Sequence, residues 1–210
     1  MTPMPPTSTP GPTSTAAPTS ASGQISTAAV SGLVSTLAAW QPRSSTQDDL
    51  RREYLAFVQD HAGQALDREG GPEHITGSCF VFTPDLRQVL LCYHRKGRFW
   101  VQLGGHVEAA DASVAAGALR EAREEGGIAD LVPVRLAPLD VDRHALSNRF
   151  GRCTVHWDVG FGAIAPEGAV PVTSEESEDV AWWPVDALPS DAAPGLSDRL
   201  RTALAEITPS

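Results

Sequence analysis

Residues 104–128 read GGHVEAADASVAAGALREAREEGGI, and this stretch decides the fold. In its second half, apolar residues recur at positions i, i+3, i+4 and i+7: Ala115, Ala118, Leu119 and Ala122. This spacing predicts a helix over residues 113–125 whose apolar face packs on a sheet. The glycine pair that follows is a typical end for such a helix.

The predicted helix carries three glutamates on a separate face. Glu121, Glu124 and Glu125 stand at i, i+3 and i+4, so their side chains share one stripe about 120° from the apolar face. Crowded carboxylates repel one another, and Mg²⁺ relieves such repulsion because it takes oxygen ligands. A solvated acidic face is the alternative interpretation. Gly104 and Gly105 would let the backbone approach a ligand without a Cβ in the way.

The segment from Arg120 to Ile128 matches the pattern R-E-U-x-E-E-x-G-U, in which U is an apolar residue. A chance match at a given position is rarer than about one in a million at ordinary residue frequencies. The stretch resembles the Nudix box, the signature of the Nudix hydrolase family. Residues 182–185 resemble the family's closing strand and turn, and the resemblance covers about residues 76–189.

One departure from the family pattern lies before the helix. The family box reads G-x5-E-x7-R-E, whereas here Asp111 takes the place of the first Glu after Gly105. Eight residues rather than seven then separate Asp111 from Arg120. We therefore expect a turn one residue longer, in which Asp111 caps the helix or orders the loop rather than binding metal.

The resemblance implies an α/β fold, a Nudix-type α/β/α sandwich with a mixed β-sheet. It also implies a hydrolase that uses Mg²⁺ or Mn²⁺ to cleave a phosphoanhydride bond in a nucleoside diphosphate linked to another group. The chemistry is consistent, because attack by water on a polyanionic phosphate requires charge neutralisation and an activated water.

Carried over residue by residue, the resemblance assigns the metal to Glu121, Glu124, Glu125 and the backbone of Gly105. Arg120 would orient a box glutamate by ion pairing. A carboxylate would accept the proton of the attacking water. The candidates for this base are the box glutamates, Glu124 and Glu125 among them, and Glu176 in a late acidic loop.

Candidate substrate-binding residues surround the box. Arg95, Lys96 and Arg98 would hold substrate phosphates, or else form a solvated hairpin turn. His106 directly follows Gly105 and is a candidate to face the substrate, although Mg²⁺ prefers oxygen to imidazole. His156 lies on the polar face of an expected strand, which is either a wall of the site or open surface.

The chain divides into three predicted parts. Residues 1–44 are a Pro-, Ser-, Thr- and Ala-rich tail that is expected to be disordered, with a short helix over 25–40 as an option. Residues 45–75 form an N-terminal helix and linker, and 76–208 form the Nudix domain. The extra helix, expected over 45–67, is a candidate cover for the pocket or contact in a homodimer.

The remaining elements are expected from apolar runs and alternation. An amphipathic helix is expected near the C-terminus, and strands are expected over residues 79–82, 89–93, 99–103, 131–141, 153–164 and 180–183.

Composition excludes several classes of partner. A net charge of -10 over 210 residues argues against general nucleic-acid binding, which needs a basic face. No run of 18 apolar residues occurs, so we expect no membrane span. The three cysteines are too few for a disulfide framework and show no zinc spacing, which favours a cytoplasmic protein. The expected partner is a small-molecule nucleotide or diphosphate.

Two other functions remain open at this stage. One is a catalytically silent nucleotide sensor on the same fold, although such proteins usually lose the box carboxylates. The other is an isoprenoid diphosphate isomerase, which needs a cysteine and an acid in the pocket. Cys92 and Cys153 have the pattern of strand residues, which disfavours this second option.

Overall fold

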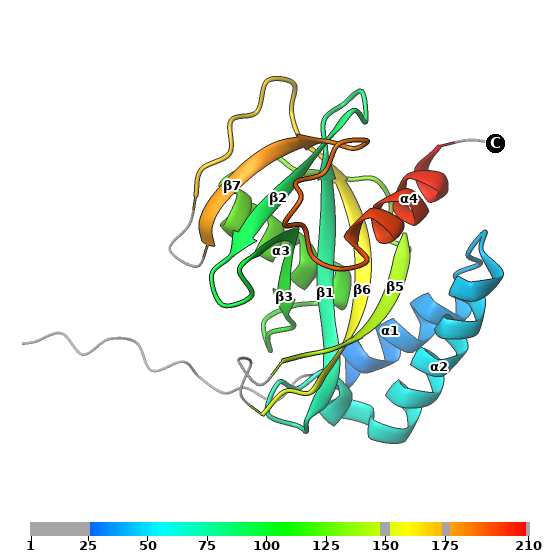
Figure 1. Cartoon of the computed structure of the whole chain (residues 1–210). Coiled ribbons are helices and arrows are strands. Elements are labelled where there is room, and N and C mark those ends of the chain that lie inside the picture. Colours follow the sequence, from blue (N-terminus) through cyan, green and yellow to red (C-terminus); the bar gives the residue numbers. More distant parts are fainter. Residues whose placement is uncertain (1–25, 148–151, 174–176, 209–210) are drawn as a thin grey trace, which may run out of the picture.

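The computed structural model describes residues 26–147, 152–173 and 177–208 (Figure 1). Of the helices in these ranges, none is long and apolar enough to cross a membrane. The elements follow in the order α1 (Thr27–Ala39), α2 (Ser45–His61), the 3₁₀ helix η1 (Ala62–Ala65), β1 (Glu73–Phe82), β2 (Gln88–His94), β3 (Phe99–His106), α3 (Val114–Gly126), β4 (Val132–Pro133), β5 (Asp140–Ala145), β6 (Val155–Ile164), β7 (Ser177–Pro184) and α4 (Leu196–Ile207).

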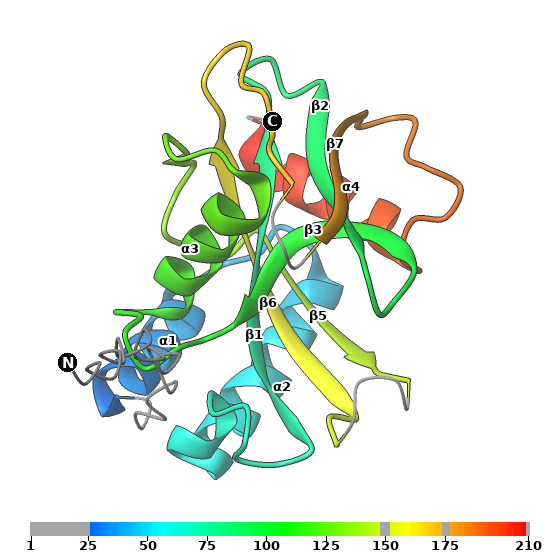
Figure 2. The same cartoon turned by 90° about the vertical axis from the view of Figure 1, so that its left-hand side faces the viewer.

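A mixed seven-stranded sheet forms the centre of the molecule. Its strand order is β4-β6-β1-β3-β2-β7, with β5 also paired to β6. β1 and β6 run parallel, and the other pairs are antiparallel. Figures 1 and 2 show α3 on one side of the sheet and α4 on the other. The expected α/β/α sandwich with a mixed sheet is confirmed.

The side chains of β1 separate two apolar layers. Ile75, Cys79 and Val81 belong to the buried cluster that contains the apolar face of α3. Phe80 and Phe82 point the other way and pack in a second cluster with α4. The second face turns polar toward the start of the strand, because alternation places Thr76 and Ser78 on the same side as Phe80.

β6 alternates as its sequence predicts. Trp157 and Val159 are buried in the α3 cluster, whereas His156 and Asp158 lie on the opposite face. Both polar residues line a pocket, so this face is a wall of the site rather than open surface.

α3 forms where the box predicts it. The backbone N–H of Ala116 donates to the hydroxyl of Ser113, which is therefore the N-cap. Gly127 ends the helix in the left-handed conformation, with φ of 64°. A Cβ at Gly77 would lie 3.2 Å from that of Ala118, so glycine there lets the helix approach β1 closely.

Residues 25–40, for which the sequence offered either tail or helix, contain α1. Leu33, Leu37 and Trp40 are buried in the same apolar cluster as Tyr54 of α2. The rest of the predicted tail, residues 1–25, lies outside the described residues. The division of the chain after residues 44 and 75 stays a prediction.

Three expected elements are shorter in the structure. The strand predicted over 153–164 begins at Val155. The strand predicted over 131–141 is reduced to β4 and to the start of β5, because Pro133 and Pro138 lack the N–H that a continuous ladder requires. The helix predicted over 45–67 ends at His61, since Ala62 adopts a φ of 47° and breaks the α-helical path.

A single guanidinium joins α4 to the polar part of the sheet. Arg199 donates from Nε to Oδ2 of Asp140 at 2.6 Å and from Nη2 to Oδ2 of Asp158 at 2.8 Å. Both carboxylates are buried, and the hydroxyls of Thr76 and Ser78 also donate to Asp158. Burial opposes the charge of Asp158, but Arg199 and Ser78 outweigh it and hold the pKa of this carboxyl below its usual value.

We predict that Arg199→Met lowers the free energy of unfolding by about 3–5 kcal/mol, because it leaves two buried carboxylates without a counter-charge. The measurement is urea unfolding at neutral pH. Arg201→Met is the matched control on the same helix, since Arg201 and its partner Asp198 are mostly exposed. It should change stability by less than about 0.5 kcal/mol. Equal losses in the two variants would contradict a stabilising role for the buried network.

Candidate active site

A pocket of about 570 Å³ lies over the polar face of the sheet. Its walls come from β1, β2, β3, β6 and the C-terminal half of α3. The described residues that line it include most of the predicted site: Arg95, Lys96, Gly105, His106, Glu121 and Glu125.

Two of the three box glutamates lie in this pocket. The backbone N–H of Gly104 donates to Oε2 of Glu125 at 2.8 Å. A Cβ at Gly105 would lie 2.8 Å from the carboxylate of Glu121, so this carboxylate rests directly against the strand backbone. The i, i+4 spacing thus brings Glu121 and Glu125 onto the end of β3.

Glu124 lies differently from the other two glutamates. Its side chain is 60% exposed, and it accepts a hydrogen bond from Arg120 at 3.0 Å. It is not among the described residues that line the pocket. The structure therefore groups Glu121 with Glu125 and leaves Glu124 at the rim.

Arg120 neutralises a cluster of carboxylates. Its guanidinium donates to Asp111 at 3.1 Å through two nitrogens and to Glu121 and Glu124 at 3.0 Å. It also donates to the backbone carbonyl of His106 at 3.3 Å. The hydrogen bond to Asp111, with the nearby negative charges, raises the pKa of Arg120. Arg120 thus forms an ion pair with Glu121, and its role in orienting a box glutamate stays a prediction.

Asp111 orders the turn before α3. Its Oδ2 accepts the backbone N–H of Glu108 at 2.8 Å, and its side chain is only 6% exposed. A Cβ at Gly117 would lie 2.7 Å from Oδ2, so glycine at that position makes room for the carboxylate. Of the two expected roles the structure supports loop ordering, since the helix cap is Ser113.

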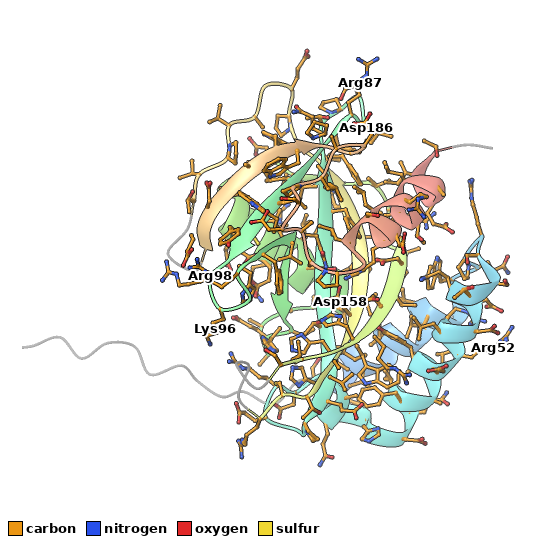
Figure 3. The ribbon with its side chains drawn as sticks, in the orientation of Figure 1. Arg52, Arg87, Lys96, Arg98, Asp158 and Asp186 are labelled. Carbon is orange, nitrogen blue, oxygen red and sulfur yellow. The ribbon has the colours of Figure 1, made fainter. Side chains whose placement is uncertain are left out.

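The predicted basic residues separate at the β2–β3 turn. Arg95 and Lys96 line the pocket, whereas Arg98 is not among its described lining residues. Arg98 instead lies 3.7 Å from Glu178, with its guanidinium 6.0 Å from the centre of the Tyr93 ring. Figure 3 shows Lys96 and Arg98 at one end of the sheet, far from Arg87 at the other. A phosphate-binding role for Arg98 stays a prediction.

Imidazoles form another wall of the pocket. His106 and His156 lie with their ring centres 5.4 Å apart, and His74 of β1 packs beside both. Burial and the neighbouring imidazoles lower the pKa of His106 to about 4 and that of His156 to about 3. These rings are therefore neutral at physiological pH.

Both cysteines that bear on the isomerase alternative line the pocket. Cys92 lies on β2, and Cys153 lies two residues before β6. A strand-like sequence pattern therefore did not exclude either thiol from the pocket, and Cys153 does not belong to a strand in the structure. Glu176, the late-loop candidate for the base, lies outside the described residues.

The polar residues beside the pocket that the sequence did not reveal include His74, Asp140 and Arg199. One signal was present for Arg199, which stands three positions after Leu196 on the apolar stripe of α4. A charged residue on such a stripe indicates a buried partner. No comparable signal marks His74.

Comparison with known proteins agrees with the observed fold. The NUDIX domain model matches residues 72–205. Similar solved structures include a NUDIX hydrolase from Clostridium perfringens, with 20% identity and a TM-score of 0.50 over 64% of this chain and 95% of that one. A C. elegans Ap4A hydrolase has 15% identity and a TM-score of 0.53 over 62% and 95%. The E. coli dihydroneopterin triphosphate pyrophosphohydrolase has 17% identity and a TM-score of 0.50 over 60% and 92%. Among curated proteins, none matches significantly.

We predict that the free energy of unfolding falls at acid pH because His106 and His156 are buried in the neutral form. The lowered pKa values of His106 and His156 mean that the unfolded chain, with histidine pKa values of about 6.5, binds more protons below neutrality. The free energy of unfolding should therefore fall from about pH 6.5 toward pH 4. Urea unfolding in EDTA at several pH values measures this slope. His156→Gln should make the free energy of unfolding depend less steeply on pH. His61→Gln is the control at an exposed histidine and should leave the pH dependence unchanged. Equal slopes in the wild type and both variants would contradict the prediction.

Proposed function

The chain belongs to the Nudix family, and we propose that it is a pyrophosphohydrolase that depends on Mg²⁺ or Mn²⁺. Its substrate class would be a nucleoside diphosphate linked to another group, cleaved at a phosphoanhydride bond. The observation that carries this proposal is the placement of Glu121 and Glu125 together in the pocket, against Gly104 and Gly105.

The donor groups in this wall fit a hard divalent cation. Glu121 and Glu125 offer carboxylate oxygens, and Gly105 offers backbone that no Cβ shields. These three residues would hold the ion, with Glu124 as a further ligand only if it left its contact with Arg120. When bound, the ion would neutralise phosphate charge and lower the pKa of the attacking water.

The protein groups around the donors support hydrolysis in distinct ways. Arg120 holds Glu121 in place and stays charged, since its pKa is raised by the carboxylates around it. Of the candidate bases Glu124 and Glu125, only Glu125 lines the pocket, so we assign it the acceptance of the proton from water. Arg95 and Lys96 would hold the substrate phosphates at the β2–β3 turn.

The two alternatives predict outcomes that differ from hydrolysis. A nucleotide sensor would bind nucleotides without turnover, and the intact box carboxylates argue against it. An isomerase would convert an isoprenoid diphosphate without releasing phosphate. Cys92 and Cys153 line the pocket and supply the thiol that such a reaction needs, so product analysis belongs in the first assay.

We predict metal-dependent turnover on a panel of nucleoside diphosphate derivatives, with activity in Mg²⁺ and none in EDTA. Glu121→Gln and Glu125→Gln should each lower kcat by about 100-fold or more, because they remove pocket carboxylates. Glu124→Gln should lower it less, since Glu124 is exposed at the rim.

Circular dichroism and urea unfolding check that these variants are folded. Turnover unchanged by Glu121→Gln and Glu125→Gln would place the metal elsewhere and contradict the proposal. A larger loss in Glu124→Gln than in Glu125→Gln would identify Glu124 as the ligand that moves into the pocket on metal binding.

We predict that Arg95→Met and Lys96→Met raise KM by about 2- to 10-fold with little change in kcat, as expected for single exposed charges that bind phosphate. Steady-state kinetics on the substrate found in the panel measures the effect. Arg87→Met is the control, because Arg87 is 85% exposed and lies at the far end of the sheet (Figure 3). An equal rise in KM in the control would show a general charge effect instead.

A further inference from the structure

We propose a second metal site, for Zn²⁺ or a similar transition-metal ion, formed by His74, His106, Cys153 and His156. Each residue offers one donor atom, and these four atoms all lie within 4.8 Å of one another. The site differs from the box carboxylates in its donors, its elements and its preferred metal, and it does not depend on the proposed hydrolase activity.

The sheet register assembles the four residues. His74 of β1 is opposite His156 in the parallel pair with β6. His106 of β3 is opposite Thr76, one pleat along β1 on the same face. Cys153 lies just before β6, with its Sγ 3.7 Å from Nε2 of His74. Because the ligands come from three strands and the segment before β6, no local spacing of Cys and His in the sequence marks this site.

The donor spacing is close to that of a tetrahedral site. In a tetrahedral shell, Zn–N distances of about 2.0–2.1 Å and a Zn–S distance of about 2.3 Å place neighbouring donors about 3.3–3.6 Å apart. Donor atoms that lie up to 4.8 Å apart would therefore need to close by about 1.2–1.5 Å at most. Four protein donors complete a tetrahedral shell, which is typical of a structural rather than a catalytic zinc site.

A second observation points to a missing ligand. The Nε2 atoms of His106 and His156 are buried and have no hydrogen-bond partner among the described residues. An unpaired buried polar atom is costly, and a metal ion would supply the partner that both rings lack. Their lowered pKa values keep the rings neutral, the form in which imidazole binds metal.

The chemistry of the donor set selects the ion. Three imidazoles with one thiolate suit Zn²⁺, Co²⁺ or similar ions, whereas Mg²⁺ prefers oxygen. The pocket would thus hold two metals of different kinds, a hard cation at the helix carboxylates and a softer one at the histidines. The second ion would tie β1, β3 and β6 together at the edge of the pocket.

The test is titration of the chelator-treated full chain with Co²⁺, followed by absorption spectroscopy. We expect a thiolate-to-cobalt charge-transfer band together with the intense visible bands of tetrahedral Co²⁺, both displaced by Zn²⁺. Cys153→Ser should abolish the charge-transfer band. Cys92→Ser, which changes a different thiol of the same pocket, should leave it intact, and Glu125→Gln should also leave it intact.

The affinity for Co²⁺ tests the role of the histidines. His156→Ala should weaken Co²⁺ binding by at least about 100-fold, since loss of an outer-shell partner alone weakens metal binding by about 10- to 100-fold. His61→Ala is the matched control, because His61 is exposed on α2. Unfolding curves without metal show whether each variant is folded.

The rate at which Cys153 reacts with a thiol reagent gives a second, independent measure of metal binding. Cys79 and Cys92 are buried, and burial raises the pKa of Cys79 to about 12, so Cys153 should be the thiol that a disulfide reagent modifies in the native protein. Zn²⁺ should slow this modification. A Co²⁺ spectrum without a thiolate band, a band that persists in Cys153→Ser, or Co²⁺ binding abolished by Glu125→Gln would overturn the proposal.

Discussion

The burial of two carboxylates beneath α4 is the constraint on which the rest of the structure depends. Asp140 of β5 and Asp158 of β6 are both buried, and Arg199 of α4 donates hydrogen bonds to both carboxylates. Gly160 belongs to the same arrangement, since a Cβ there would lie 1.8 Å from Oδ1 of Asp140. The ion pairs fix where α4 crosses the sheet, because any shift of Arg199 would leave a buried charge unpaired.

The placement of α4 determines where the pocket opens. Along β1 the face toward α4 is apolar at Phe80 and Phe82, and the helix covers it there. Nearer the start of the strand the same face carries Thr76 and Ser78, which line the pocket. The same face of β1 thus supplies both a packed apolar layer and the polar floor of the pocket. Asp158 of β6 lies between these two regions, because it accepts hydrogen bonds from Thr76 and Ser78 on the floor and from Arg199 of α4.

Two walls of this pocket have different chemistry. The end of α3 presents carboxylate oxygens that Arg120 holds in order, and the proposed hydrolysis depends on them. The strand wall presents imidazoles and a thiol, which suit a softer ion. Gly105 and His106 are the last two residues of β3, so the end of this strand serves both proposals.

The sequence by itself determined the helix of residues 113–125, its glycine end and its acidic stripe, because local spacing decides which side chains share a helical face. The alternation of β6 was predictable for the same reason. Only the tertiary structure decided that Glu124 lies apart from Glu121 and Glu125, that Arg199 pairs with Asp140 and Asp158, and that His74 meets Cys153. Glu124 differs from the other two because only Glu121 and Glu125 meet the end of β3. The contacts of Arg199 and His74 join elements far apart in the chain, so they depend on strand register and on the packing of the helix against the whole sheet.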